Sequence, residues 1–280
     1  MSYEVTFVPD DGLYCPEIGG WSLDKYRMLG LYASLFSTGM KAKWERRIYV
    51  DLYAGSGYGK LQNSGKIVQG SPLIALTVKD PFDKYIFCDE DEEKLTALEV
   101  RARRVAPTAD MVFILGDCNA RVDEILQAIP TASPGHGVLS LCFVDPYNLV
   151  GVRFATLRQL AVRFIDFFCL LALHMDANRN YARYLDEDAD QVDKFLDLTD
   201  WRDRWNAAKW DGLKFPKFLA REFSEQMCSI GFLPEYAMKE VRSDEKNLRL
   251  YHLALFSRSR LAFDYWAQVL KYSTDQTSLF

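Results

Sequence analysis

The sequence lacks the features that mark several classes of protein. It has only three histidines, and its six cysteines include no CxxC pair. Because zinc sites need clustered ligands, no metal site is expected. Glycine (16 residues) and proline (10) are too scarce for a collagen-like or low-complexity chain. Most of the cysteines lie in or beside apolar runs, so we expect reduced core thiols in a cytoplasmic protein.

Long hydrophobic runs are also missing. No apolar segment follows Met1, and the longest apolar run, 164–173, contains Asp166 and is too short to cross a bilayer. We therefore expect neither a secretory signal nor a membrane span. Acidic residues (39) outnumber basic ones (34), which argues against strong general nucleic-acid binding but allows a local basic patch.

What is present is a regular alternation of short apolar runs and helical patterns. This alternation predicts an α/β fold with a parallel sheet covered by helices on both faces. A helix is expected at 22–37 with Ser22 as its N-cap, and two later runs joined by the polar stretch 242–247 predict an antiparallel hairpin. The expected strands are 47–53, 85–88, 111–115, 138–144 and 164–173, followed by the hairpin strands 235–241 and 248–257. The expected helices between them are 72–78, 92–105, 119–129 and 154–162.

The chain divides into four expected parts of one domain, 1–280. They are an N-terminal helical segment (1–46), a cofactor-binding core (47–175), a helical insertion (176–230), and a terminal hairpin with a tail (231–280). The insertion is polar and rich in aromatic residues, and no internal repeat is present.

A glycine-rich loop is the strongest local signal. The stretch YVDLYAGSGYGK, Tyr49 to Lys60, places Gly55, Gly57 and Gly59 directly after an apolar strand. Neither the P-loop ending nor the G-x-G-x-x-G dinucleotide spacing is present, which disfavours a nucleotide-dependent oxidoreductase. Asp51, four residues before the first glycine, would repel phosphate and attract an ammonium group, as in S-adenosylmethionine. The alternative is a tight turn that binds no ligand.

Acids recur at the ends of the expected strands. Asp89 could accept ribose hydroxyls, Asp117 could accept the adenine amino group, and Asp145 stands before Pro146 and Tyr147. Helix N-capping is the alternative for Asp89, which precedes a helix together with Glu90 and Asp91, and for Asp117. The repetition favours a ligand site along one edge of the sheet.

These residues resemble the class I S-adenosylmethionine-dependent methyltransferases. The resemblance implies a Rossmann-like seven-stranded sheet of order 3-2-1-4-5-7-6. It also implies contacts with the cofactor: the methionine part on the glycine loop, its amino group near Asp51, the ribose on Asp89 and the adenine near Asp117. The implied cofactor-binding residues are Asp51, Ala54, Gly55, Ser56, Gly57, Gly59, Asp89, Glu90, Asp117 and Cys118.

Several short motifs in order resemble a narrower family, the three-Cys-motif partner (TcmP) proteins. They are Trp21-Ser22-x-x-Lys25, YVDLYAGSG, GSPLIAL at 70–76, FVDPY, and YHLALFSRS with Trp266. The resemblance implies a bacterial, methyltransferase-like protein with a neighbouring partner, a three-Cys-motif protein of radical-S-adenosylmethionine type.

The catalytic motif departs from one known pattern. Amino-methylating nucleic-acid enzymes carry [DNS]-P-P-[YFW], whereas this chain has Asp145-Pro146-Tyr147-Asn148, one proline short. A methyltransferase with Asp145, Pro146 and Tyr147 at its catalytic centre remains the first hypothesis, acting on an amino or other polar group of a nucleic-acid or small planar substrate. A non-catalytic partner subunit in a phage-defence or mobile-element system is the alternative.

Candidate substrate contacts lie at several places along the chain. They are Lys25, Asn148, His174 and Arg179. A solvated helix face is the alternative for Lys25, and a structural role is the alternative for His174. Two basic clusters, Lys41 to Arg47 and Arg101 to Arg104, could contact nucleic acid, or could be solvated faces balanced by acids.

Overall fold

A seven-stranded sheet forms the centre of the computed structural model, which describes residues 3–234, 238–242 and 248–274. Its spatial order is β10-β11-β9-β8-β3-β6-β7. The strands are β3 (Arg46–Asp51), β6 (Lys84–Asp89), β7 (Met111–Leu115), β8 (Val138–Val144), β9 (Ile165–Leu171), β10 (Lys239–Arg242) and β11 (Arg249–Phe256). The first five pair in parallel, and β11 runs antiparallel to both β9 and β10. Numbered by appearance, this is the order 3-2-1-4-5-7-6, so the predicted Rossmann-like class I methyltransferase fold is confirmed.

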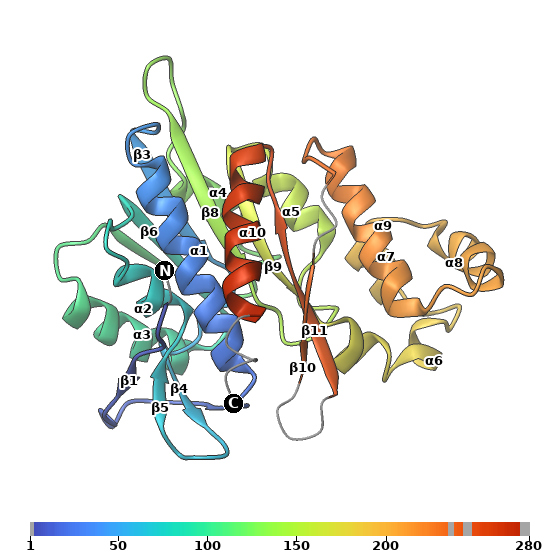
Figure 1. Cartoon of the computed structure of the whole chain (residues 1–280), viewed down its shortest axis with the longest axis horizontal. Helices are drawn as coiled ribbons and strands as arrows, with labels where there is room; N and C mark the ends of the chain where they lie inside the picture. Colours follow the sequence, from blue (N-terminus) through green and yellow to red (C-terminus); the bar gives the residue numbers. More distant parts are fainter. Residues whose placement is uncertain (1–2, 235–237, 243–247, 275–280) are drawn as a thin grey trace.

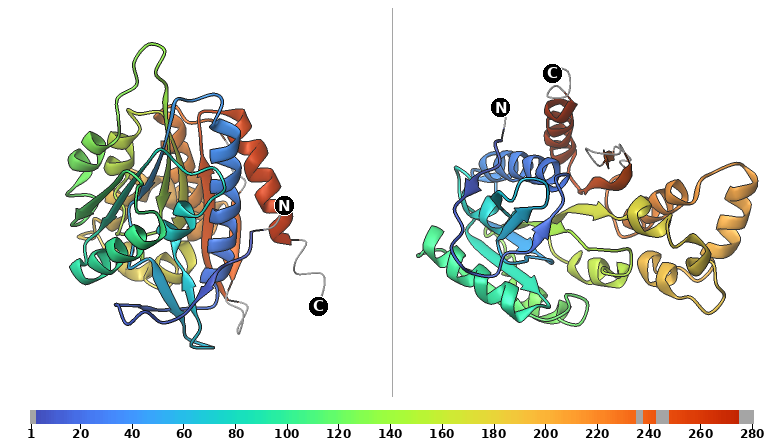
Figure 2. Two further views of the ribbon diagram at one scale, coloured as in Figure 1. Left: turned by 90° about the vertical axis from the view of Figure 1, so that its left-hand side faces the viewer. Right: turned by 90° about the horizontal axis from the view of Figure 1, so that it is seen from below.

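Helices cover both faces of the sheet (Figures 1 and 2). One face carries α1 (Ser22–Met40), α2 (Ser71–Leu76), α3 (Glu92–Val105) and α10 (Arg260–Thr274), and the other carries α4 (Val122–Ala128) and α5 (Phe154–Leu160). Alternation along β3 feeds two separate cores, since Tyr49 packs in the core of α1 and α10 while Ile48 and Val50 pack in the core of α4 and α5. Right-handed crossovers produce this two-sided cover.

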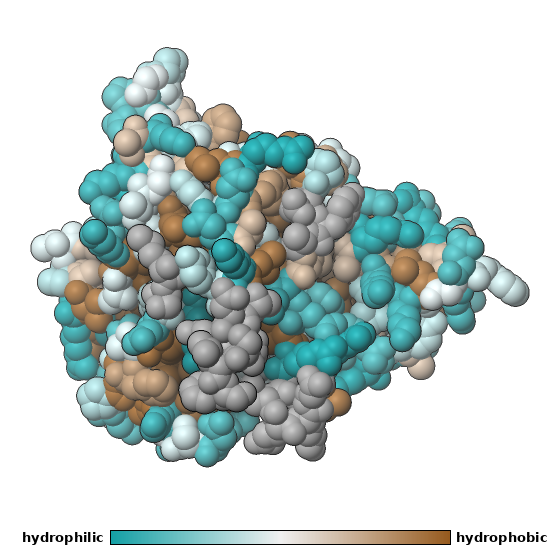
Figure 3. Space-filling view, viewed as in Figure 1, coloured by the Kyte–Doolittle hydropathy of each residue, from teal (hydrophilic) through white to brown (hydrophobic). Residues whose placement is uncertain are grey.

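The predicted helical insertion is also confirmed. It consists of the π-helix η1 (Leu173–Ala177), α6 (Tyr181–Tyr184), α7 (Gln191–Leu196), α8 (Trp201–Trp210) and α9 (Phe215–Ser229). In Figure 1 it extends to one side of the sheet, beyond α5 and β11. Trp201 and Trp205 are buried in the core of the insertion. The face of the insertion that Figure 3 shows is largely hydrophilic.

A second, small sheet was not predicted. It has the order β1-β5-β4-β2, from β1 (Phe7–Val8), β2 (Glu17–Ile18), β4 (Tyr58–Leu61) and β5 (Ile67–Gln69). The segment 1–46 is therefore not purely helical, and the glycine loop runs directly into a hairpin. Strands of two to four residues are too short to give a periodic sequence pattern.

Several element ends differ from the expected ones. Helix α1 begins at Ser22 itself and Trp21 is the N-cap, so the N-cap role predicted for Ser22 is wrong. The predicted strand 235–241 lies partly outside the described residues, because 235–237 are not described and the observed strand is Lys239–Arg242. The link 243–247 and the tail residues 275–280 also lie outside them.

Among the described residues, no helix combines the length and the apolar character needed to cross a bilayer. The six cysteines are free thiols. Four are buried as predicted, whereas Cys15 and Cys228 are only partly buried.

Candidate functional site

The glycine loop after β3 has the backbone conformation that only glycine adopts easily. Gly55 has φ +62° and Gly57 has φ +80°. A Cβ at Gly55 would have no heavy atom within 4 Å, so open space lies beside the loop backbone. Gly59 differs, because it lies in β4 and a Cβ there would come within 2.5 Å of Ile18 Cδ1. Packing against β2 therefore accounts for the third glycine.

Asp89, at the end of β6, holds this loop. Its Oδ2 accepts the Gly55 N–H at 2.7 Å, and its Oδ1 accepts the Asp91 N–H at 3.0 Å. The N-cap of α3 is Asp91, so the capping alternative holds for that acid and not for Asp89. Each carboxylate oxygen of Asp89 keeps a second lone pair that can accept a ligand hydroxyl. Glu90, the next residue, is exposed.

Asp51, at the end of β3, is fully buried. It accepts hydrogen bonds from the Tyr49 hydroxyl and the Tyr53 N–H, each at 3.2 Å. Burial, with a smaller contribution from the charge of Asp145, raises the pKa of Asp51 to about 7, against the opposing hydrogen bonds from Ser71 and the Tyr53 N–H. Ser71 is the first residue of α2, and Gly70 is the N-cap of that helix.

Asp145, at the end of β8, forms an ion pair with Lys25 of α1. Lys25 Nζ lies 2.5 Å from Asp145 Oδ2, and the two side chains are only 11% and 17% exposed. Burial alone would lower the pKa of Lys25, but the charges of Asp145 and nearby groups hold it above its usual value. Lys25 is thus neither a solvated helix residue nor free to contact a substrate while this pair is intact.

The segment after Asp145 presents one exposed ring. Pro146 is buried, Asn148 is partly buried, and the Tyr147 side chain is 86% exposed. The next residue, Leu149, donates its N–H to Asp176 Oδ2 at 2.6 Å.

The sequence reading missed Asp176. This buried residue of η1 also accepts the Tyr184 hydroxyl at 2.8 Å and so ties the Asp145–Asn148 segment to the insertion. The sequence signal that could have indicated it is an acidic residue shortly after the apolar run 164–173.

Asp117 and Cys118 follow β7. Asp117 is exposed, and its Oδ1 accepts the Asn119 N–H at 3.0 Å within its own loop. Helix α4 starts only at Val122, so Asp117 does not cap it and that alternative is wrong. The Cys118 Sγ lies 3.2 Å from the Tyr53 hydroxyl, and burial raises the pKa of this thiol to about 11.

Arg101 corrects the prediction of a basic face on α3. Its side chain is 1% exposed. The guanidinium donates to both carboxylate oxygens of Asp11 (2.6 and 3.0 Å) and to the carbonyls of Leu13, Tyr14 and Ser56. It therefore joins the N-terminal segment to the glycine loop. No local pattern in the sequence indicates this role.

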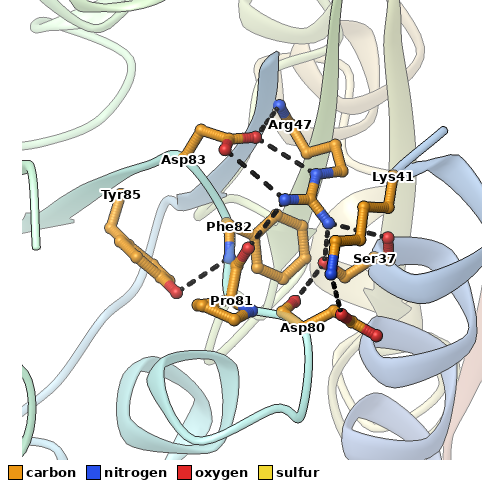
Figure 4. A network of polar contacts seen from close by, with 8 residues as sticks. All are labelled: Ser37, Lys41, Arg47, Asp80, Pro81, Phe82, Asp83 and Tyr85. Atoms are coloured by element: carbon orange, nitrogen blue, oxygen red, sulfur yellow. Dashed lines mark hydrogen bonds and ion pairs between the residues drawn. The ribbon is translucent and has the colours of Figure 1, made fainter. Parts of the chain in front are cut away.

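The other basic cluster is also largely paired, as Figure 4 shows for two of its members. Arg47 is buried and binds Asp83 and the carbonyls of Ser37 and Pro81. Lys41 Nζ lies 2.7 Å from Asp80 Oδ1. Nucleic-acid binding by this cluster stays a prediction.

The structure brings together only part of the predicted site. Lys25, Asp51 and Asp145 form one charge cluster, and Asp89 holds the Gly55 backbone. His174 faces Glu240 and His252 instead, and Arg179 is exposed.

No family model matches the sequence, and no curated protein matches it. Among solved structures, protein LPL1258 from Legionella pneumophila is 10% identical, with 87% of this chain and 88% of that chain covered and a TM-score of 0.49. Magnesium protoporphyrin IX methyltransferase from Synechocystis, with bound SAH, is 10% identical over 84% and 83%, with a TM-score of 0.41. An rRNA methylase from Streptococcus thermophilus is 9% identical over 82% and 94%, with a TM-score of 0.38. Likenesses this distant carry no argument about activity, so the fold assignment rests on the strand order of the sheet itself.

Proposed function

We propose that this protein binds S-adenosylmethionine at the carboxyl edge of its sheet and is an S-adenosylmethionine-dependent methyltransferase. The observation that carries the proposal is a class I strand order combined with an open glycine loop that Asp89 holds by the Gly55 N–H. Ligands of such folds bind outside the carboxyl ends of the strands, where the strand order reverses. Here that point lies between β3 and β8.

The residues of this edge suit the parts of the cofactor. In our proposal the backbone from Ala54 through Ser56 to Gly59 borders the methionine part, and Asp51 attracts its amino group. The remaining lone pairs of Asp89, with Glu90 beside it, accept the ribose hydroxyls, and Asp117 and Cys118 border the adenine. S-adenosylmethionine supplies a methyl group already activated on a sulfonium, so this chain has mainly to align an acceptor with it.

The substrate we propose is planar and carries a polar acceptor atom, in a nucleic acid or a small molecule. The exposed Tyr147 ring offers a stacking surface, and stacking on an aromatic side chain is worth about 1–3 kcal/mol per base. Asp145 would orient the acceptor, and Asn148 and Arg179 would offer polar contacts nearby. Because Lys25 holds Asp145, orientation fits this carboxylate better than removal of a proton.

Replacing Asp89 with alanine is expected to weaken S-adenosylmethionine binding about 10- to 100-fold, since hydrogen bonds to a charged group contribute about 1.5–3 kcal/mol. Isothermal titration calorimetry with S-adenosylmethionine and S-adenosylhomocysteine measures this. Asp110→Ala is the matched control, because it removes one exposed carboxylate near the opposite edge of the sheet. No heat from the wild-type protein with either ligand would sink the proposal.

Cofactor binding is expected to release protons near pH 7. The pKa of Asp51 is raised to about 7, so about half of this carboxyl is protonated at that pH. A cation bound nearby lowers the pKa of Asp51, so binding should release up to about half a proton at pH 7. Affinity should accordingly rise as the pH rises through 7. Titrations in two buffers of different protonation enthalpy count the protons, and Asp51→Asn should abolish the release. Equal heats in both buffers at pH 7 would contradict the assignment.

The second candidate function is a non-catalytic partner subunit, and the Lys25–Asp145 pair favours it, because a carboxylate already paired with a cation is a weaker partner for a substrate. This candidate corresponds to a TcmP protein acting in the cytoplasm of a bacterium beside a three-Cys-motif partner. Radiolabelled S-adenosylmethionine incubated with nucleic-acid, protein and small-molecule extracts separates the two. Cofactor binding without transfer to any extract, together with co-purification of one fixed partner, would support the partner subunit over the enzyme.

A further inference from the structure

Two histidines and a glutamate far apart in the sequence meet where the terminal hairpin crosses the insertion. Glu240 of β10 and His252 of β11 are direct cross-strand partners, so their side chains share one face of the hairpin. His252 is also opposite Leu171, the last residue of β9, and His174 follows in η1. The two imidazole rings lie 5.4 Å apart between centroids.

The geometry points to a metal site: we propose that His174, Glu240 and His252 bind a divalent transition-metal ion such as Zn²⁺. The Nε2 atoms of both histidines lie 3.9 Å from Glu240 Oε2, and one ligand atom from each residue lies within 4.8 Å of the others. Ligands on one tetrahedral zinc ion, each about 2.1 Å from it, stand about 3.4 Å apart. The two histidine–glutamate separations exceed this spacing by about half an ångström, and the 4.8 Å limit allows an excess of at most about 1.4 Å between the two histidines, so small side-chain shifts bring all three residues to ligand distance of one ion.

The state of the side chains suits a metal that prefers nitrogen. All three side chains are partly buried, and a neutral imidazole has a lone pair to offer a metal ion. Within the part of the chain that the structure describes, the buried His252 Nδ1 has no hydrogen-bond partner. Two imidazoles and one carboxylate favour Zn²⁺, Co²⁺ or Ni²⁺ over Mg²⁺ and Ca²⁺. Three protein ligands also leave one coordination position open.

Two arginines define the surroundings of the carboxylate. Arg242 donates to Glu240 Oε1 at 2.7 Å, the position of an outer-shell donor that orients a ligating carboxylate. Arg249 Nε lies 3.1 Å from Oε2, the oxygen that faces the histidines. Because its positive charge competes with the metal for that oxygen, Arg249 should limit the affinity of the site.

Spectroscopic titration of the full chain tests the proposal. Protein stripped with a chelator is titrated with Co²⁺, whose visible absorption reports nitrogen and oxygen ligation, and bound Co²⁺ is then displaced with Zn²⁺. We expect one ion per chain. His252→Ala and, separately, His174→Ala should each weaken binding more than about tenfold, since even outer-shell residues contribute 10- to 100-fold.

The third histidine provides the control. His136 is exposed and pairs with Glu45 near the opposite edge of the sheet, so His136→Ala should leave the Co²⁺ affinity unchanged. Arg249→Gln should tighten binding several-fold. Absence of a Co²⁺ spectrum in the wild type, equal losses in His136→Ala and His252→Ala, or weaker binding by Arg249→Gln would each overturn the proposal. The titration needs no cofactor, so its result is independent of the proposed methyltransferase function.

Discussion

Arg101→Met is expected to lower the free energy of unfolding by about 3–5 kcal/mol, the usual loss when one partner of a buried ion pair is removed. The guanidinium is the shared donor for Asp11 and for three backbone carbonyls, including that of Ser56 in the glycine loop. Methionine fills much of the volume but donates nothing, so these acceptors lose their partner away from water. Urea denaturation measures the change, and hydrogen exchange of residues 11–14 and 55–57 should quicken.

Arg104→Met is the matched control for this prediction. Arg104 lies on the same helix and also reaches Asp11, at 3.4 Å, but its side chain is 60% exposed. An exposed ion pair contributes less than about 1 kcal/mol, so this variant should stay close to the wild type. If Arg101→Met loses no more free energy of unfolding than Arg104→Met, the buried guanidinium does not stabilise the N-terminal segment 11–14.

Lys25→Met should lower the free energy of unfolding by about 3 kcal/mol, because it leaves the largely buried Asp145 carboxylate without its cation and beside the fully buried Asp51. Asp145→Asn in the same chain should recover much of the loss, and a double-mutant cycle gives the coupling of the pair.

Lys41→Met tests whether burial is the cause. Lys41 Nζ is also close to a carboxylate, 2.7 Å from Asp80, but its side chain is 63% exposed. Its loss should cost less than about 1 kcal/mol. If Lys25→Met and Lys41→Met are equally stable, or if Asp145→Asn deepens the loss, the buried Lys25–Asp145 ion pair does not stabilise the fold.

Regular elements were predictable because their patterns are local. The run VLSLCFV, 138–144, coincides with β8, and the helix predicted at 92–105 coincides with α3. An unbroken apolar run predicts a buried strand and an amphipathic pattern predicts a helix without reference to the rest of the chain. The small sheet was missed because its short strands form only by pairing with segments that are distant in the sequence. Glu17 and Ile18 become a strand only beside Lys60 and Leu61.

Acids at strand ends were predictable, but their partners were not. The sequence placed Asp51, Asp89 and Asp145 at one edge of the sheet, since the ends of parallel strands share an edge. It could not state that Lys25 reaches across from α1 to Asp145, or that Arg101 turns inward. Both depend on where a helix packs against the sheet, which no local pattern encodes.

By itself, the sequence determined the class I fold and the parallel core with its antiparallel last strand. It also determined the glycine loop, in which Gly55 and Gly57 adopt positive φ angles. These follow from hydrophobic periodicity and from local backbone sterics. Tertiary structure alone decided which charges are paired and which are open, and it alone brought His174, Glu240 and His252 together. The physical reason is that desolvation and ion pairing depend on atoms brought close by packing, whereas the sequence fixes only the order in which those atoms are joined.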